Sequence, residues 1–265
     1  MDGTEKHGVE KLRKIAHDIR KREEQDASLR TARREQLQML PKIPAIPGYS
    51  FGAYYLPAGE IGGDFYDFIN LKGNRLGIVI GDVTGHGIEA AIIMGMAKMA
   101  FHIRVQGMGS PRELMGLAND DLFAELHRTA FVTGAFAVID RATRKMAYVR
   151  AGHCPLLLRR GSEVKDLAVG GIPFGVTDGS PFLMSNPEGE ADLKAGDIVL
   201  LYTDGVIEAG PPTAQFGMAR LRKTLLAAPV DSAASAMKAV VAALDAYLDK
   251  TPQGDDTTLV CLKIK

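Results

Sequence analysis

Four aspartates, each beside a glycine, recur where apolar runs of this 265-residue chain begin or end. They are Asp64, Asp82, Asp204 and Asp255. Clustered carboxylates repel one another, so such a group needs cations or must take up protons. Ligands that offer only oxygen suit magnesium, manganese or calcium and argue against zinc or copper. Four aspartates would balance two divalent ions, an arrangement that activates water for in-line displacement at phosphorus.

The segment around Asp82 shows how such an acid would be positioned. An apolar run over 76–80 predicts a buried strand, which breaks at Asp82, and an apolar helix is expected over 88–106. An acid at the end of a strand projects into a crevice, and neighbouring glycines let the backbone approach a ligand. Taken alone, a glycine–aspartate step at the end of a strand is equally typical of an ordinary turn. The repetition of such steps at four places in the chain favours a cation site.

The rest of the chain alternates predicted strands and helices. Strands are expected over 50–56, 65–71, 131–140, 146–151, 155–160, 197–203 and 257–264, and further helices over 110–127, 218–227 and 231–248. The turn at 72–74 predicts a hairpin, and Ser110 with Glu113 forms a capping box. The Gly- and Pro-rich span 161–190 shows no period and is predicted to be a long, functional or mobile loop. Strand runs with helices in two groups predict an α+β fold of sheet layers covered by helices.

Composition excludes several classes of protein. The formal net charge is zero, so nothing favours nucleic-acid binding. The longest apolar run, around 88–101, contains Glu89 and Lys98 and is too short for a membrane span. Two cysteines are too few for a disulfide scaffold, and the polar N-terminus lacks the apolar core of a secretion signal. We therefore expect a cytoplasmic protein.

Residues 1–40 differ from the rest because they are dense in charge. Four apolar residues with helical spacing form one stripe: Val9, Leu12, Ala16 and Ile19. The pattern then fails at Glu23 and Asp26, before three heptads are complete. Two interpretations stay open: a helix that packs on a partner or a second copy, and a solvated or docked linker helix. We expect a helical regulatory or linker segment over 1–40 and one domain over 41–265.

Seven stretches, in this order, resemble the metal-dependent protein phosphatases of the PPM group, in their bacterial SpoIIE and RsbU branch. They are PAGEIGGDFYD at 57–67, GDVTGHG at 81–87, FVT at 131–133, AGHCP at 151–155, GIPFG at 171–175, LYTDGVIEA at 201–209 and DDTT at 255–258. Any one of them is weak, but seven in sequence are highly specific. The resemblance covers the chain from about residue 45 to its end.

The resemblance implies a fold and a ligand set. The fold is a four-layer α-β-β-α sandwich of two antiparallel sheets flanked by helices. Asp82 is expected to bridge two manganese or magnesium ions, with the backbone carbonyl of Val83 as a further ligand. Asp64 would complete the coordination of the second ion, and Asp204 and Asp255 would complete that of the first.

The resemblance also implies a reaction, in which a hydroxide held between the metals attacks a phosphoserine or phosphothreonine in line. His86 is a candidate general acid, although in the wider group the corresponding histidine follows the bridging aspartate more closely. Asp256 is interpreted as a turn residue or a neighbouring acceptor, and Asp67 as a water-orienting residue or a solvated loop acid. His153 is expected to order a loop by a hydrogen bond. No arginine for the substrate phosphate is identified.

The expected substrate is a phosphorylated anti-anti-sigma protein with a STAS domain, whose dephosphorylation would release a sigma factor through partner switching in a bacterial stress response. An activator, or self-association, would act through the N-terminal helix. One alternative is a catalytically inactive module of the same fold that only binds its partner. Its weakness is that mutually repelling carboxylates have no purpose without cations. Another, an unrelated two-metal nuclease, is disfavoured by the absence of a basic bias.

Overall fold

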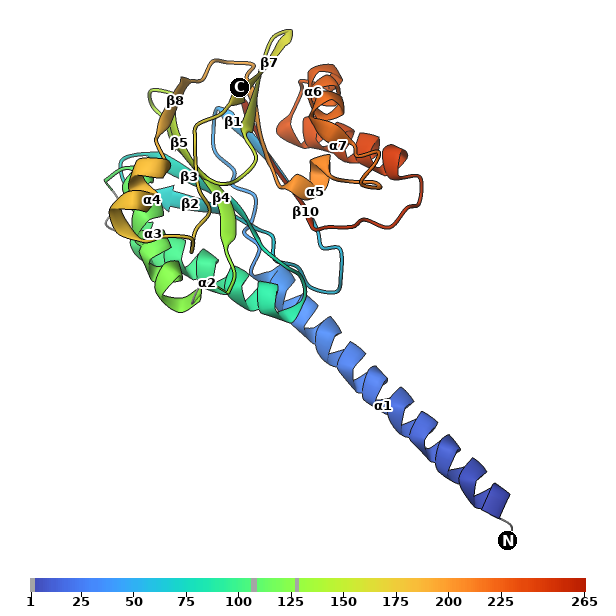
Figure 1. Cartoon of the computed structure of the whole chain (residues 1–265). Helices are drawn as coiled ribbons and strands as arrows, with labels where there is room; N and C mark the ends of the chain where they lie inside the picture. The colour runs from blue at the N-terminus through green and yellow to red at the C-terminus, as the bar shows by residue number, and fades with distance from the viewer. Residues whose placement is uncertain (1–2, 106–108, 127–128) are drawn as a thin grey trace. The chain divides into compact units, whose positions relative to one another are not determined.

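The computed structural model describes residues 3–105, 109–126 and 129–265, which form two compact units, 1–39 and 40–265 (Figure 1). The first unit is a single helix, α1 (Gly3–Gln38), which runs through the predicted break in its apolar stripe. The side chains of Val9, Leu12 and Ala16 lie outside the described ones, and Ile19 is exposed.

The second unit contains two antiparallel sheets of five strands. One has the order β1 (Tyr49–Leu56), β10 (Thr257–Ile264), β9 (Ile198–Tyr202), β6 (Leu156–Arg160) and β7 (Glu163–Leu167). The other has the order β2 (Phe65–Leu71), β3 (Arg75–Val83), β4 (Val132–Asp140), β5 (Lys145–Ala151) and β8 (Gly189–Asp192). Most pairs join strands that are consecutive in the chain, and the exceptions are β1–β10, β5–β8 and β6–β9.

Helices cover the outer face of each sheet, as Figure 1 shows for the second unit. The β2–β3–β4–β5–β8 sheet carries α2 (Ile88–Arg104), α3 (Pro111–Leu126) and α4 (Gly179–Ser185), and the other carries α5 (Asp204–Ile207), α6 (Gly217–Ala227) and α7 (Ala233–Leu248). On β3, Ile78 and Ile80 pack between the sheets, whereas Val79 packs under the helices. Both faces are buried, which explains the unbroken apolar run. The predicted four-layer α-β-β-α sandwich is confirmed.

Local signals located most element boundaries. Ser110 and Glu113 exchange the two hydrogen bonds of a capping box at the start of α3, each 3.2 Å long. Asn74 and the glycine before it adopt positive φ in the β2–β3 turn, as the hairpin prediction requires. The predicted ends of two helices, at Gln106 and His127, lie outside the described residues.

Two expectations were wrong. Short turns between the successive predicted strands 131–140, 146–151 and 155–160 are typical of antiparallel pairing. The strands β4 and β5 do pair, but β5 and β6 do not, because the chain crosses from one sheet to the other between them. The span 161–190 is not one long loop but contains β7, α4 and β8, which have 4 to 7 residues each. Elements this short do not complete enough periods to show a pattern. In the described part of the chain, no helix is both long and apolar enough to cross a bilayer.

Candidate metal centre

The four predicted aspartates lie at strand ends of both sheets. Asp82 is the penultimate residue of β3, and Asp64 directly precedes β2, the neighbour of β3. Asp204 follows β9 and begins α5, and Asp255 precedes β10, the neighbour of β9. Neighbouring antiparallel strands bring one strand's end beside the next strand's start, so each sheet supplies a pair of acids.

Electrostatic coupling shows that the two pairs are close. Burial, and then the charge of Asp82, raises the pKa of Asp64 well above its ordinary value. Burial raises the pKa of Asp82 to about 8, followed by the charges of Asp204, Asp255 and Asp256. The pKa values of Asp204 and Asp255 are also raised, first by burial of their carboxyl groups, although Asp255 as a whole residue is exposed. The acids of one sheet therefore raise the pKa of Asp82 in the other sheet, so the two pairs belong to one cluster.

Two threonines of the opposite sheet hold the Asp64 carboxylate. The hydroxyls of Thr203 and Thr258 donate to its Oδ2 at 2.8 and 2.6 Å, and the Thr258 N–H donates to the Thr203 hydroxyl at 3.0 Å. The other carboxylate oxygen, Oδ1, is buried without a hydrogen-bond partner. Neither threonine was assigned a role from the sequence, although each is a polar residue inside a motif beside a predicted ligand.

Asp256 connects the loops that carry the acids. Its Oδ1 accepts from Ala58 N at 2.8 Å, and its Oδ2 accepts from Gly63 N at 2.6 Å and from Asp64 N at 3.4 Å. A Cβ on Gly205 would overlap the Asp256 carbonyl oxygen, so only glycine fits after Asp204. Of the two interpretations of Asp256, the structure favours the neighbouring acceptor.

The two predicted histidines occupy different environments. His153 is buried, its Nδ1 lies 2.8 Å from the hydroxyl of Thr133, and Thr133 is the strand partner of Asp82. Burial, and then the charge of Arg150, lowers the pKa of His153 to about 3, so it is neutral and orders the strand ends as expected. His86 is exposed, and a positive charge on it would offset a small part of the rise that burial causes in the pKa of Asp255. The general-acid role of His86 stays a prediction.

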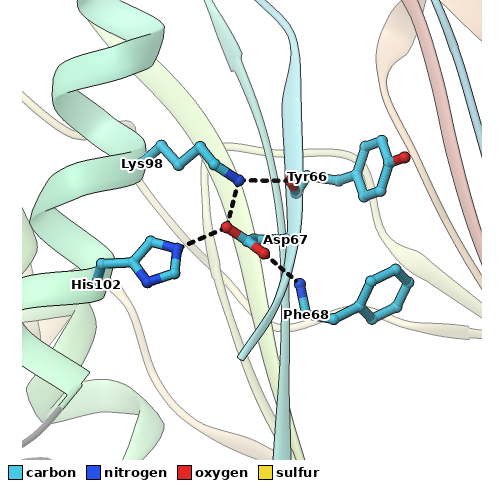
Figure 2. A network of polar contacts seen from close by, with 5 residues as sticks. All are labelled: Tyr66, Asp67, Phe68, Lys98 and His102. Atoms are coloured by element: carbon cyan, nitrogen blue, oxygen red, sulfur yellow. Dashed lines mark hydrogen bonds and ion pairs between the residues drawn. The ribbon is translucent and has the colours of Figure 1, made fainter. Parts of the chain in front are cut away.

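Asp67 is not a solvated loop acid. It lies within β2, 4% exposed, and its carboxylate contacts Lys98 and His102 of α2 (Figure 2). The sequence offered one signal for this pairing, because Lys98 interrupts the apolar run that forms α2.

The donor set fits a hard divalent cation. It consists of carboxylate and carbonyl oxygens, and an unpartnered buried oxygen on Asp64 is available to a ligand. The Val83 carbonyl faces the acidic loop, because a Cβ placed on Gly63 would lie 3.0 Å from its oxygen. Among the described residues, however, no three His, Cys, Asp or Glu side chains are gathered as a ready metal site.

Substitutions at two adjacent residues separate the loop-holding role from the proposed ligand role. Asp256→Ala should leave three backbone N–H groups without their acceptor and lower the free energy of unfolding by about 2–4 kcal/mol. Asp256→Asn keeps one acceptor oxygen, so its free energy of unfolding should lie between those of the original protein and Asp256→Ala. Asp255→Asn should leave stability nearly unchanged but weaken manganese binding. Urea denaturation and manganese titration check these results. An equal loss of manganese affinity in Asp255→Asn and Asp256→Asn would contradict them.

Comparisons with known proteins agree with this site. A sequence profile described as Stage II sporulation protein E (SpoIIE) matches residues 72–265, a range that includes Asp82, Asp204 and Asp255 and begins just after Asp64. The chain is 27% identical over 264 residues to protein IcfG of Synechocystis sp., covering 88% of this chain and 41% of IcfG. It is 26% identical over 233 residues to phosphoserine phosphatase RsbU of Bacillus subtilis, covering 87% of this chain and 68% of RsbU.

A solved structure confirms the fold. The SiaA-PP2C domain of Pseudomonas aeruginosa superposes with a TM-score of 0.80 at 23% identity, covering 92% of this chain and 98% of that domain. This chain spans less than half of the length of IcfG. The profile match, the two sheets and the order of the acids lead to one conclusion: the chain belongs to the SpoIIE family of PPM-type protein serine/threonine phosphatases.

Proposed function

We propose that this chain removes phosphate from phosphoserine or phosphothreonine of a signalling protein, using two divalent cations. The observation that supports it is the cluster of Asp64, Asp82, Asp204 and Asp255, whose pKa values are all raised by burial and then by the charges of neighbouring acids. A group of carboxylates that destabilises the protein when alone has a chemical purpose when cations neutralise it. PPM-type phosphatases are metal-dependent, which agrees with this proposal.

Each acid has a proposed place at the metals. Asp82 would bridge both ions beside the Val83 carbonyl, Asp64 would complete one ion, and Asp204 and Asp255 the other. Manganese or magnesium bound there would supply an activated water and neutralise charge on the phosphoryl group. Binding would draw together carboxylates that repel one another in the metal-free protein.

The surrounding residues prepare the ligands. Thr203 and Thr258 orient one oxygen of Asp64 and leave the other free, and Asp256 fixes the backbone N–H groups of the loop that carries Asp64. Preorganisation of this kind lowers the cost of reaching a productive geometry. His86, in the exposed loop after Asp82, would donate a proton to the leaving alkoxide.

The proposed substrate is a phosphorylated protein of the anti-anti-sigma, STAS-domain type, in a cytoplasmic partner-switching pathway. The similarity to RsbU, whose name describes a phosphoserine phosphatase, supports a phosphoprotein substrate. Both cysteines, Cys154 and Cys261, are free thiols, which agrees with a reducing compartment. The chain has no net charge, so affinity would depend on the metals and on surface contacts.

Phosphate release tests the proposal directly. The chain is incubated with para-nitrophenyl phosphate and with a phosphoserine-containing STAS-domain protein, with manganese and with EDTA. We expect turnover of both substrates with manganese only. Absence of metal-dependent turnover with either substrate would reject the proposal and leave the partner-binding module as the better interpretation.

Removal of residues 1–40 tests the proposed regulatory segment. We expect a changed basal rate or a changed response to a partner, because a helix at the domain boundary can bias the catalytic domain. Ile15 and Ile19 are 46% and 52% exposed, and alanine substitution of both keeps the helix while removing two exposed apolar side chains, one of them from the predicted stripe. If α1 packs on a partner or a second copy, the double variant should reproduce the deletion. A constitutive rate that is unaltered by the deletion would contradict the regulatory role.

A further inference from the structure

A buried ion pair joins α2 to β2. Lys98 is 8% exposed, and it is the one charged residue on the buried face of α2, which otherwise presents apolar side chains to the core. Its Nζ contacts Asp67 Oδ2 and lies 3.4 Å from the Tyr66 carbonyl oxygen, while His102 Nε2 lies 2.7 Å from the same Oδ2 (Figure 2). The remaining oxygen, Asp67 Oδ1, accepts from Phe68 N at 2.7 Å.

Stability alone is a poor explanation for this pair. Removing two charges from water is costly, and apolar residues of similar volume are often at least as stabilising in a core. An apolar pair lacks the directional preference of a hydrogen-bonded ion pair. Apolar packing is nearly indifferent to small shifts along a helix, whereas charged hydrogen bonds require defined atomic positions. Lys98 and His102 lie one turn apart and contact one carboxylate oxygen, so together they define where α2 lies along β2.

This position matters because α2 begins beside the acid cluster. Asp67 lies three residues after Asp64 on β2, and α2 starts five residues after Val83. At Gly63, an added Cβ would lie 3.1 Å from Ala90 Cβ, in the first turn of α2, and 3.0 Å from the Val83 oxygen. A shift of α2 along β2 would therefore press on, or release, the loop that carries Asp64.

We infer that Lys98, Asp67 and His102 are positioning residues that hold α2 in register on β2 and thereby set the affinity of the site for divalent cations. The inference rests on the proposed metal site. None of the three residues touches the metals or the substrate in this role. They act through Ala90, Val83 and Gly63.

Manganese affinity, measured by calorimetry, tests this inference. The variant pair Lys98→Met and Asp67→Asn, made together, removes both charges, leaves no unpaired buried ion and keeps an oxygen for Phe68 N. We expect its manganese dissociation constant to rise by about 10- to 100-fold, the usual effect of losing a residue that supports a metal ligand. At saturating manganese, kcat should return to within a few-fold of the original value, because no ligand is lost. Lys98→Arg, which keeps the charge, should stay closer to the original affinity than the double variant.

A matched control uses the other buried aspartate–cation pair, Arg160 with Asp197. Asp197 is 1% exposed and lies before β9, at the end opposite Asp204. Arg160→Met with Asp197→Asn should lower the unfolding temperature in EDTA without changing manganese affinity. His102→Ala is a second probe that the fold tolerates, since this side chain is 43% exposed, and it should weaken manganese binding by roughly three-fold.

The outcomes are distinguishable. A folded Lys98→Met, Asp67→Asn protein with unchanged manganese affinity would overturn the inference. An equal loss of manganese affinity in the Arg160→Met, Asp197→Asn control would also overturn it. If the double variant does not fold, an unchanged affinity in His102→Ala would overturn it, and the expected weakening would support it. If the unmodified chain binds no manganese, the proposed metal site itself fails.

Discussion

Asp82→Asn is expected to lower kcat/KM for para-nitrophenyl phosphate and for a phosphoserine protein by at least about 100-fold at saturating manganese. Asp82 is the only one of the four acids with a proposed place on both ions, so its loss removes a ligand from each. Asparagine has nearly the same shape but carries no charge, so the fold should persist. The measurement is phosphate release over a manganese series, because a simple loss of affinity would be recovered at high manganese.

The matched control is Asp245→Asn, an exposed aspartate of α7 on the far side of the other sheet, which should keep the original activity. A further expected result concerns the metal-free protein. Asp82→Asn should raise its unfolding temperature in EDTA, because it removes one of several mutually repelling carboxylates. Full activity of Asp82→Asn, or a lower unfolding temperature in EDTA, would contradict the proposed role.

In EDTA, the free energy of unfolding is expected to fall as the pH rises from about 6.5 to 8. The pKa of Asp82 is raised from 3.8 to about 8 in the folded protein, so the folded state binds its proton more tightly than the unfolded state. Stability from that proton is complete below the ordinary pKa and is lost as the pH approaches 8. Asp64 shifts in the same direction. At about 1.4 kcal/mol per pH unit, Asp82 accounts for a loss of at most about 2 kcal/mol over this range.

The pH range is chosen to avoid His153. Its pKa is lowered from 6.5 to about 3, so the folded state disfavours its proton, and stability from the neutral form is lost as the pH falls below 6.5. That effect opposes the Asp82 effect in acid and is absent above 6.5. Urea denaturation at about pH 6.5, 7.2 and 8.0 gives the slope. Asp82→Asn should flatten it.

Manganese should reverse the slope, because the ion binds deprotonated carboxylates and therefore binds more tightly as the pH rises. The added stability grows with the ratio of free manganese to its dissociation constant. A metal-free stability that is constant or rises between pH 6.5 and 8 would show that the acids are not buried together.

Patterns in the chain predicted the longer elements and pointed to the four candidate acids. The continuous apolar run of β3 predicted a strand, and its break at Asp82 predicted a carboxylate that projects into a crevice. The capping box at Ser110 located the start of α3, because its two hydrogen bonds are local and depend on four consecutive residues. Short elements such as α4 and β8 escaped detection because no more than about two periods are present.

The residues that hold the acids in place could not be identified in the same way. Thr203 and Thr258 donate to Asp64 from 139 and 194 residues away, and Lys98 finds Asp67 across 31 residues. A hydroxyl in a strand, or a lysine in an apolar helix, gives no indication of its partner until the sheets are stacked.

Local sequence thus predicted which residues are candidates for the chemistry, because strand ends and glycine steps place carboxylates where a ligand can approach them. Only the tertiary structure showed which backbone groups each acid contacts. Asp255 and Asp256 are adjacent and chemically identical, yet one lies exposed at the cluster and the other is buried against Ala58 and Gly63. The physical reason is that neighbouring residues at a strand end point to opposite faces, and only the packing of the two sheets determines what each face meets.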